Sequence, residues 1–289
     1  MLCSIPPFNA PKFLERFIKP ILYKHIMTDI LLTNDDGYKS VGFYPLLKEL
    51  SKDFSVVAVV PDSEKSWIGK SISARSTLKV KEIKLNNSKI FTCSGTPADC
   101  TQIGIYDFSK DKPKLVVSGI NIGENVGHGR ILSSGTIGAA MEASIDGIKA
   151  ISTSLYIPPE IKKNTNFFDD KNYSIFENAA KISLKIIKIL INHEFDDNVD
   201  LISINIPFDA TIDSEFEITK PFRDPYGKLF HKKGDKYIHI NPTLKFENLK
   251  EGTDLKALSE NKISITPISL ELVSNTSFRK LNQLISKNW

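Results

Sequence analysis

The stretch Ile30-Leu31-Leu32-Thr33-Asn34-Asp35-Asp36-Gly37-Tyr38 joins a short apolar run directly to Asn-Asp-Asp-Gly. An apolar run that ends in a turn signal is typical of a buried strand in a parallel sheet. Open α/β sheets bind ligands beyond the carboxyl ends of their strands, which is where Asp35 and Asp36 fall. Adjacent carboxylates repel each other, and a hard divalent cation is their usual partner. The same residues also fit a plain turn with Gly37 at positive φ, so this segment alone leaves both interpretations open.

Outward from this stretch, strands and helices alternate. Apolar residues at helical spacing over 43–50 lead into a second apolar strand over 54–60, which completes a βαβ unit. The pattern further predicts a hairpin over 78–93 and strands at 114–118, 150–155 and 200–206. It also predicts three helices: one that begins at Thr96, one that begins at Ser134, and one over 174–192. This alternation predicts an α/β fold with a mostly parallel sheet over residues 27–206.

The two ends of the chain do not continue this alternation of strands and helices. From residue 207 onward, short strands at 216–219, 236–240 and 262–266 are separated by Pro, Gly and Asp, which predicts β-hairpins, and a final helix is expected near 277–285. Residues 1–26 carry apolar residues at helical spacing, but Lys and Arg interrupt any signal-peptide core. We interpret residues 1–26 as an N-terminal appendage to the fold.

Composition narrows the class of protein. The 289 residues are 41% hydrophobic and 25% charged, with a formal net charge of +4. That small charge does not indicate a nucleic-acid polymer as partner, and no apolar run is long enough to span a membrane. Cys3, Cys93 and Cys100 lack metal-ligand spacing and fit free thiols in a reducing cytoplasm.

Four polar segments follow strands or open helices, so they are expected to meet at one end of the sheet: residues 34–37, the loop after Asp62, residues 118–127 and residues 134–136. The first three offer the carboxylates of Asp35 and Asp36, the hydroxyl of Ser66 and the amide oxygen of Asn121. Donors that are all oxygen suit Mg²⁺, Mn²⁺ or Ca²⁺ rather than Zn²⁺.

The fourth segment, Ser134 to Thr136, presents backbone N–H groups at a helix N-terminus, which suits a phosphate. A cation beside an anion site is the layout for metal-assisted hydrolysis of a phosphate ester. Simpler interpretations stay open at this point: Asn121 as a turn residue, Ser134 as an ordinary helix cap, and Ser66 as part of a solvated loop. Asn125 fits a loop-shaping or a phosphate-binding role, and Arg130 fits a phosphate clamp or an exposed surface residue.

Taken together, the segments resemble the SurE (survival protein E) family of metal-dependent nucleotidases. The resemblance covers roughly residues 29–270, with its motifs in family order. The matching blocks are Leu31–Gly37, Val60–Asp62 with Ser66, Ser94–Cys100, Val117–Gly127, Ser134–Glu142, Glu251–Asp254 and Ile263–Pro267. The chain departs from the family at Trp67, where many members have a glycine after the serine, so Ser63 stays open as a second candidate ligand.

The resemblance implies a Rossmann-like, three-layer α/β core over residues 27–206, with a mostly parallel sheet. It also implies a smaller, β-hairpin-rich C-terminal part over residues 207–289 that serves oligomerisation. It assigns metal binding to Asp35, Asp36, Ser66 and Asn121, with Asp35 and Asp36 catalytic. The implied phosphate- or substrate-binding positions are Asn34, Gly95, Thr96, Asn125, Ser134, Gly135 and Thr136.

Members of this family remove phosphate from nucleoside 5′- and 3′-monophosphates, and some trim short polyphosphate. The resemblance therefore implies a cytoplasmic 5′-nucleotidase that forms a homodimer or homotetramer and holds one Mg²⁺ or Mn²⁺ per subunit. The alternative is a nucleotide-binding regulatory protein on the same scaffold with little catalysis. Phosphate release from nucleotides separates the two.

Overall fold

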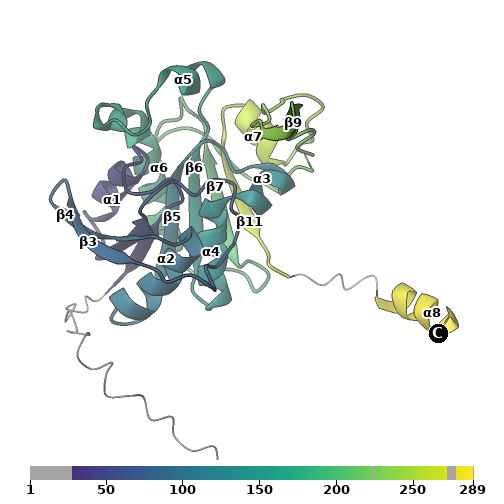
Figure 1. The fold of residues 1–289 in the computed structure, drawn as a ribbon, viewed down its shortest axis with the longest axis horizontal. Coiled ribbons are helices and arrows are strands. Elements are labelled where there is room, and N and C mark those ends of the chain that lie inside the picture. The colour runs from purple at the N-terminus through teal and green to yellow at the C-terminus, as the bar shows by residue number, and fades with distance from the viewer. Residues whose placement is uncertain (1–27, 224, 272–277, 289) are drawn as a thin grey trace, which may run out of the picture.

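The computed structural model describes residues 28–223, 225–271 and 278–288, so the expected appendage over residues 1–26 lies outside the described residues. Within them, a nine-stranded sheet has the order β3-β4-β2-β1-β5-β6-β7-β11-β8, and helices cover both of its faces (Figure 1). Its strands are β1 (Ile30–Thr33), β2 (Val56–Pro61), β3 (Val80–Leu85), β4 (Ser88–Cys93), β5 (Leu115–Ile122), β6 (Ala150–Leu155), β7 (Leu201–Ile206), β8 (Phe216–Ile218) and β11 (Ile263–Ile268).

Eight α-helices lie in the residues that the structure describes. They are α1 (Phe43–Leu50), α2 (Pro97–Ile103), α3 (Gly127–Ser133), α4 (Gly135–Ile145), α5 (Pro159–Asn164), α6 (Glu177–Leu190), α7 (Asp254–Ser259) and α8 (Phe278–Asn288). None of the helices in the part of the chain that the structure describes combines the length and the apolarity needed to cross a lipid bilayer.

Residues Ile30–Thr33 form strand β1 in the interior of the sheet. β1 pairs in parallel with β2 on one side and with β5 on the other. All four of its residues are buried, because helices cover it from both faces. The parallel pairing continues through β6 and β7, which confirms the expected α/β fold with a mostly parallel sheet.

Each face of the sheet has its own apolar core. Phe43 of α1 and Phe176 beside α6 belong to a cluster on one face, together with Ile30 and Leu32. Ile137 of α4 and Cys100 of α2 belong to the cluster on the other face, together with Leu31. Alternate residues of β1 therefore anchor opposite cores, as the period of two in a strand requires.

Beyond β7 the expectation of successive hairpins is wrong for two of the three strands. β9 (Phe230–Lys233) and β10 (Lys236–His239) do form an antiparallel hairpin. β11, however, pairs antiparallel with β7, and β8 pairs in parallel with β11. Parallel neighbours need a long connection, which here contains the β9–β10 hairpin and α7, so local alternation could not reveal this pairing.

Candidate active site

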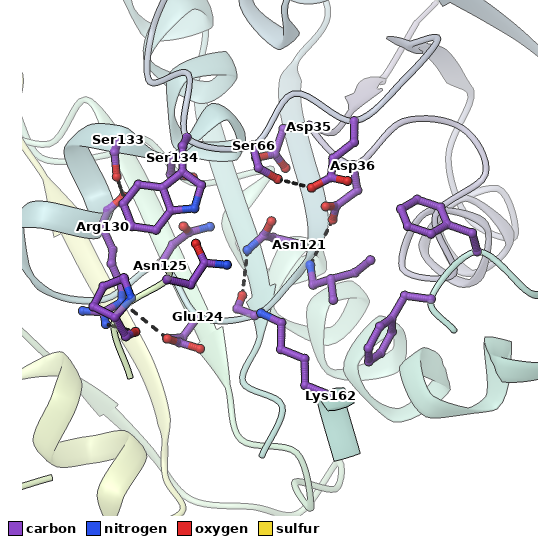
Figure 2. Close-up of a pocket in the computed structure, with 18 residues that line it drawn as sticks. Asp35, Asp36, Ser66, Asn121, Glu124, Asn125, Arg130, Ser133, Ser134 and Lys162 are labelled. Atoms are coloured by element: carbon purple, nitrogen blue, oxygen red, sulfur yellow. Dashed lines mark hydrogen bonds and ion pairs between the residues drawn. The ribbon is translucent and has the colours of Figure 1, made fainter. Parts of the chain in front are cut away.

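A cavity of about 350 Å³ opens at the carboxyl ends of β1 and β5 (Figure 2). Its wall comes from loops that are far apart in the sequence, because the parallel strands bring their carboxyl ends to one edge. Six of the residues expected at the site line it: Asp35, Asp36, Ser66, Asn121, Asn125 and Ser134.

Asp35 and Asp36 are both buried, at 3% and 6% exposure. Oδ1 of Asp35 accepts a 2.5 Å hydrogen bond from the Thr136 hydroxyl, and Oδ2 of Asp36 accepts a 3.0 Å bond from the backbone N–H of Ile122. Burial raises the pKa of Asp35 to about 6. Burial, followed by the charge of Asp35, raises the pKa of Asp36 well above its usual value. Two ionised carboxylates are thus unfavourable here by themselves, and a divalent cation would compensate both.

Neutral oxygens stand beside the carboxylates. The side-chain amide of Asn121 donates a 2.7 Å hydrogen bond to the carbonyl of Gly123. Its amide oxygen consequently points toward the side of the pocket that holds Ser66 and Asp36 (Figure 2). Ser66 is exposed on the wall and donates a 2.7 Å bond to Glu64. Ser63 instead bonds to Asp62 and is not among the described residues of the wall, so the geometry favours Ser66 as the ligand.

This donor set fits a hard cation. Its four side chains offer two carboxylates, one hydroxyl and one amide oxygen, as Mg²⁺ or Mn²⁺ prefers. Across residues 28–223, 225–271 and 278–288, no group of three or more His, Cys, Asp or Glu side chains could hold a metal ion. A metal at this edge of the sheet therefore depends on the neutral oxygens as well as on the carboxylates.

Asn34 shapes the loop that carries the carboxylates. Its side chain accepts a 3.2 Å hydrogen bond from the N–H of Gly37 and donates a 3.0 Å bond to the carbonyl of the same residue. Gly37 has φ +83, where a side chain would also crowd the backbone of Ser63. The turn over residues 34–37 is therefore also the segment that carries both carboxylates. Asn34 stabilises this turn and does not line the cavity itself.

Helix α4 meets the pocket with its first turn. The Ser134 hydroxyl accepts a 3.1 Å hydrogen bond from the N–H of Ile137 and also lines the cavity. Gly135 lies directly against Asp35, since a Cβ on this glycine would fall 2.8 Å from the Asp35 Cβ. Thr136 is fully buried and bonds to Asp35. Ser134 therefore faces the cavity, while Gly135 and Thr136 hold Asp35 in place.

Asn125 both holds its own loop in place and lines the cavity. Its backbone N–H donates a 2.7 Å hydrogen bond to Asn205, and its side-chain amide donates a 2.9 Å bond to the hydroxyl of Ser154. These bonds fix the loop after β5 to β6 and β7. Because the side chain also lines the cavity, its position is set by the sheet rather than by the loop itself.

Gly95 and Thr96 are not among the described residues that line the cavity. Thr96 instead caps α2 in a reciprocal capping box with Asp99. Its hydroxyl also donates a 2.6 Å hydrogen bond to the carbonyl of Ser71. Thr96 thus anchors the loop that carries Ser66 without lining the pocket itself.

Residues 127–133, which include Arg130, form helix α3. Its glycine-rich first turn has no local side-chain cap, but Asp254 of α7 accepts a 2.7 Å hydrogen bond from the N–H of Gly127. This cap comes from a distant segment, so the sequence pattern gave no sign of it. In Figure 1, α3, α7 and β9 lie together on one side of the sheet.

The interpretation of Arg130 as an exposed surface residue is wrong. Its side chain is only 8% exposed and lines the cavity. The guanidinium donates a 3.2 Å hydrogen bond to the carbonyl of Pro242, and its Nε lies 3.5 Å from the carboxylate of Glu124. Arg130 thereby joins α3 to the segment after β10, which closes one side of the pocket.

Several further residues of the wall were not expected from the sequence, among them Glu64, Trp67 and Lys162. The Trp67 ring lies 5.4 Å from the ring of Tyr226 and 4.9 Å from that of His239 in β10. The departure from the family pattern at Trp67 was the available signal for it. Glu64 and Lys162 lie in polar, charged segments with no periodicity, so nothing local distinguished them from solvated surface residues.

The comparisons with known proteins agree on one family. The sequence model of the family described as "Survival protein SurE" matches residues 30–228. The chain is 36% identical to a protein of Methanoregula boonei named 5′-nucleotidase SurE, over 89% of this chain and 98% of that protein. It is 37% identical to the protein of that name from Methanocaldococcus jannaschii, over 90% and 97% of the two chains.

A solved structure shows the same fold. The crystal structure of the SurE protein from Aquifex aeolicus is similar with a TM-score of 0.72 at 30% identity, and the match covers 88% of this chain and 98% of that one. The chain therefore belongs to the survival protein SurE family.

Proposed function

We propose that this protein is a divalent-metal-dependent 5′-nucleotidase that hydrolyses nucleoside monophosphates to nucleoside and phosphate. The observation that carries this proposal is the buried pair Asp35 and Asp36, which stands beside the first turn of α4 in one cavity. The printed name of the relatives from Methanoregula boonei and Methanocaldococcus jannaschii supports the same activity. Hydrolysis of 3′-monophosphates and of short polyphosphate belongs to the same proposal.

Asp35, Asp36, Ser66 and Asn121 would hold one Mg²⁺ or Mn²⁺ per subunit. When bound, such an ion polarises a phosphate oxygen and lowers the pKa of water. Either Asp35 or Asp36 orients the attacking water and accepts its proton. The Thr136 hydroxyl and the Ile122 N–H each hold one carboxylate oxygen, so both side chains are fixed before substrate arrives.

The first turn of α4 and the neighbouring amide bind the phosphoryl group. The Ser134 hydroxyl lines the cavity and can donate to its oxygens as negative charge develops there, and the N-terminal end of the helix favours that charge. Asn125, held by Ser154, presents its amide from the opposite loop. Asn34, Gly95, Thr96, Gly135 and Thr136 act in this proposal as supports of the binding residues.

The test is phosphate release from a panel of nucleoside 5′- and 3′-monophosphates and short polyphosphate, with Mg²⁺, with Mn²⁺ and with EDTA. We expect release that requires the ion and favours 5′-monophosphates. Nucleotide binding without release by the folded, metal-loaded protein would overturn the proposal in favour of the regulatory alternative.

We further propose a cytoplasmic homodimer or homotetramer that uses residues 207–289. An apolar cavity of about 460 Å³ beside β8 supports this, because the exposed side chains of Phe216 and Ile218 and the neighbouring Ile189 of α6 would gain from being covered by a second copy. Light scattering on the purified protein tests the assembly. A monomer at micromolar concentration would contradict it.

A further inference from the structure

The wall of the active-site cavity carries an imbalance of charge. Among the described residues it contains four carboxylates, from Asp35, Asp36, Glu64 and Glu124, and two cationic side chains, from Arg130 and Lys162. Arg130 already interacts with Glu124 and with the carbonyl of Pro242. A divalent ion would offset the charge of Asp35 and Asp36, but a phosphate monoester brings two further negative charges. The cavity thus needs a cation that is free to meet the substrate.

Lys162 meets that requirement. In the part of the chain that the structure describes, its ammonium has no hydrogen-bond or ion-pair partner, although it lines the cavity. The side chain extends from α5 into the pocket toward Asn121 (Figure 2). A Cβ on Gly123 would fall 3.1 Å from the Lys162 Nζ, so this glycine leaves room for the ammonium. Its charge reaches Asp36, where it partly offsets the effect of burial on the pKa of that carboxyl.

We propose that Lys162 binds the phosphate group of the substrate, from a different side of the cavity than Ser134. This inference rests on the proposed function, because it names a further binding residue for the same reaction. An ammonium on a flexible stem can follow a phosphate as a point charge, whereas Arg130 is held in a fixed place by its two partners. Being a cation, Lys162 cannot itself be a metal ligand. Its contribution is therefore specific to the anionic part of the substrate.

The test compares Lys162→Met, Lys162→Arg and a matched control, Lys163→Met, which changes an exposed lysine of the same helix that is not part of the described wall. Calorimetry measures the affinity of the Mn²⁺-loaded protein for inorganic phosphate and for adenosine. We expect Lys162→Met to weaken phosphate binding by about 10–100-fold, the usual effect of losing a hydrogen bond to a charged group. Adenosine binding should be unchanged, and Lys162→Arg should restore most of the phosphate affinity.

A second readout needs no substrate. The affinity of the substrate-free protein for Mn²⁺ should stay the same or increase in Lys162→Met, because a like charge near the site is removed. A merely structural role would instead lower both the metal affinity and the melting temperature. Unchanged phosphate affinity in Lys162→Met, or an equal loss in Lys163→Met, overturns the inference. Should the wild-type protein release no phosphate while its phosphate binding still depends on Lys162, the nucleotidase proposal fails and the inference stands.

Discussion

The hydroxyl of Thr136 donates a 2.5 Å hydrogen bond to Oδ1 of Asp35 and so connects the first turn of α4 to the end of β1. The two residues are far apart in the sequence, and both are buried. Because one oxygen of Asp35 is occupied by this bond, its other oxygen has a fixed direction. The link thus sets the orientation of a carboxylate that would otherwise have to be ordered when the metal binds.

Thr136→Val tests this link, since it keeps the shape of the side chain and removes the donor. A buried charged group that loses a hydrogen bond costs about 1–3 kcal/mol, so we expect turnover and Mn²⁺ affinity to fall by about tenfold or more. Thr136→Ser should restore both. The measurements are steady-state kinetics and calorimetry with Mn²⁺. Normal kinetics in Thr136→Val would mean that packing alone orients Asp35.

Asp36→Asn should lower turnover by orders of magnitude without unfolding the protein. In EDTA the variant should melt at the same or a higher temperature, because it no longer places two carboxylates side by side in a buried site. Metal at about 100 times its Kd should stabilise the wild type by about 2.7 kcal/mol and the variant far less. Calorimetric melting with and without Mn²⁺ checks this. A variant with normal turnover would remove Asp36 from the catalytic pair.

Asp254→Ala should destabilise the protein by about 1–3 kcal/mol or more, as judged by urea unfolding. The Asp254 carboxylate accepts hydrogen bonds from the N–H groups of Gly127, Phe222 and Leu255, and the alanine leaves these donors without it. Asp254→Asn keeps one acceptor and should cost less. Equal stability of all three proteins would show that α3 does not depend on this cap.

The same residue gives a pH dependence of defined sign. Burial raises the pKa of Asp254 above 3.8, although the three N–H donors oppose this. A carboxyl group whose pKa is higher in the folded than in the unfolded state contributes stability at low pH. That contribution is lost as the pH rises through the folded-state pKa. The advantage of the wild type over Asp254→Asn should therefore shrink as the pH rises above about 4. Urea unfolding of both proteins at each pH measures it, and a growing advantage would contradict the assignment.

Trp67→Gly restores the residue that many members of the family carry. The ring contacts with Tyr226 and His239 are lost, so we expect faster amide hydrogen exchange in β9 and β10. Trp67 has φ +60, which glycine adopts without strain, so the overall melting temperature should change little. Exchange in β1 and β2 serves as the internal control. Unchanged exchange in the hairpin would show that other contacts hold it over the cavity.

The core of the fold was predictable because its signals are local. Strands β1, β2 and β7 are fully or almost fully buried. Because both faces of such a strand are covered, its sequence is a nearly continuous run of apolar residues. The hairpin turn at Asn86 and Asn87 was likewise visible, and both residues have the positive φ that such a turn requires. The pairing of β8 was not visible, since its exposed side chains carry no pattern that identifies a neighbour.

The residues of the candidate site likewise fall into those that the sequence could place and those that it could not. Asp35 and Asp36 follow β1, Asn121 lies at the carboxyl end of β5, and Ser134 opens a helix, so sheet topology brings them to one edge. Lys162 and Arg130 could not be placed this way, because they reach the cavity from short helices whose orientation is set by tertiary contacts. Thr96 was expected at the pocket but does not line it. A residue of a family motif can support a site from a distance while its own side chain bonds elsewhere, as the Thr96 hydroxyl does to the carbonyl of Ser71.

The cavity wall runs from Asp35, in the turn after β1, to Asn241 and Pro242, which follow the β9–β10 hairpin. Synthesis proceeds from the N-terminus, and domains generally fold as units. The two carboxylates therefore emerge early, while the segment that closes one side of the cavity is synthesised much later. The cavity can be completed only when most of the protein has been made.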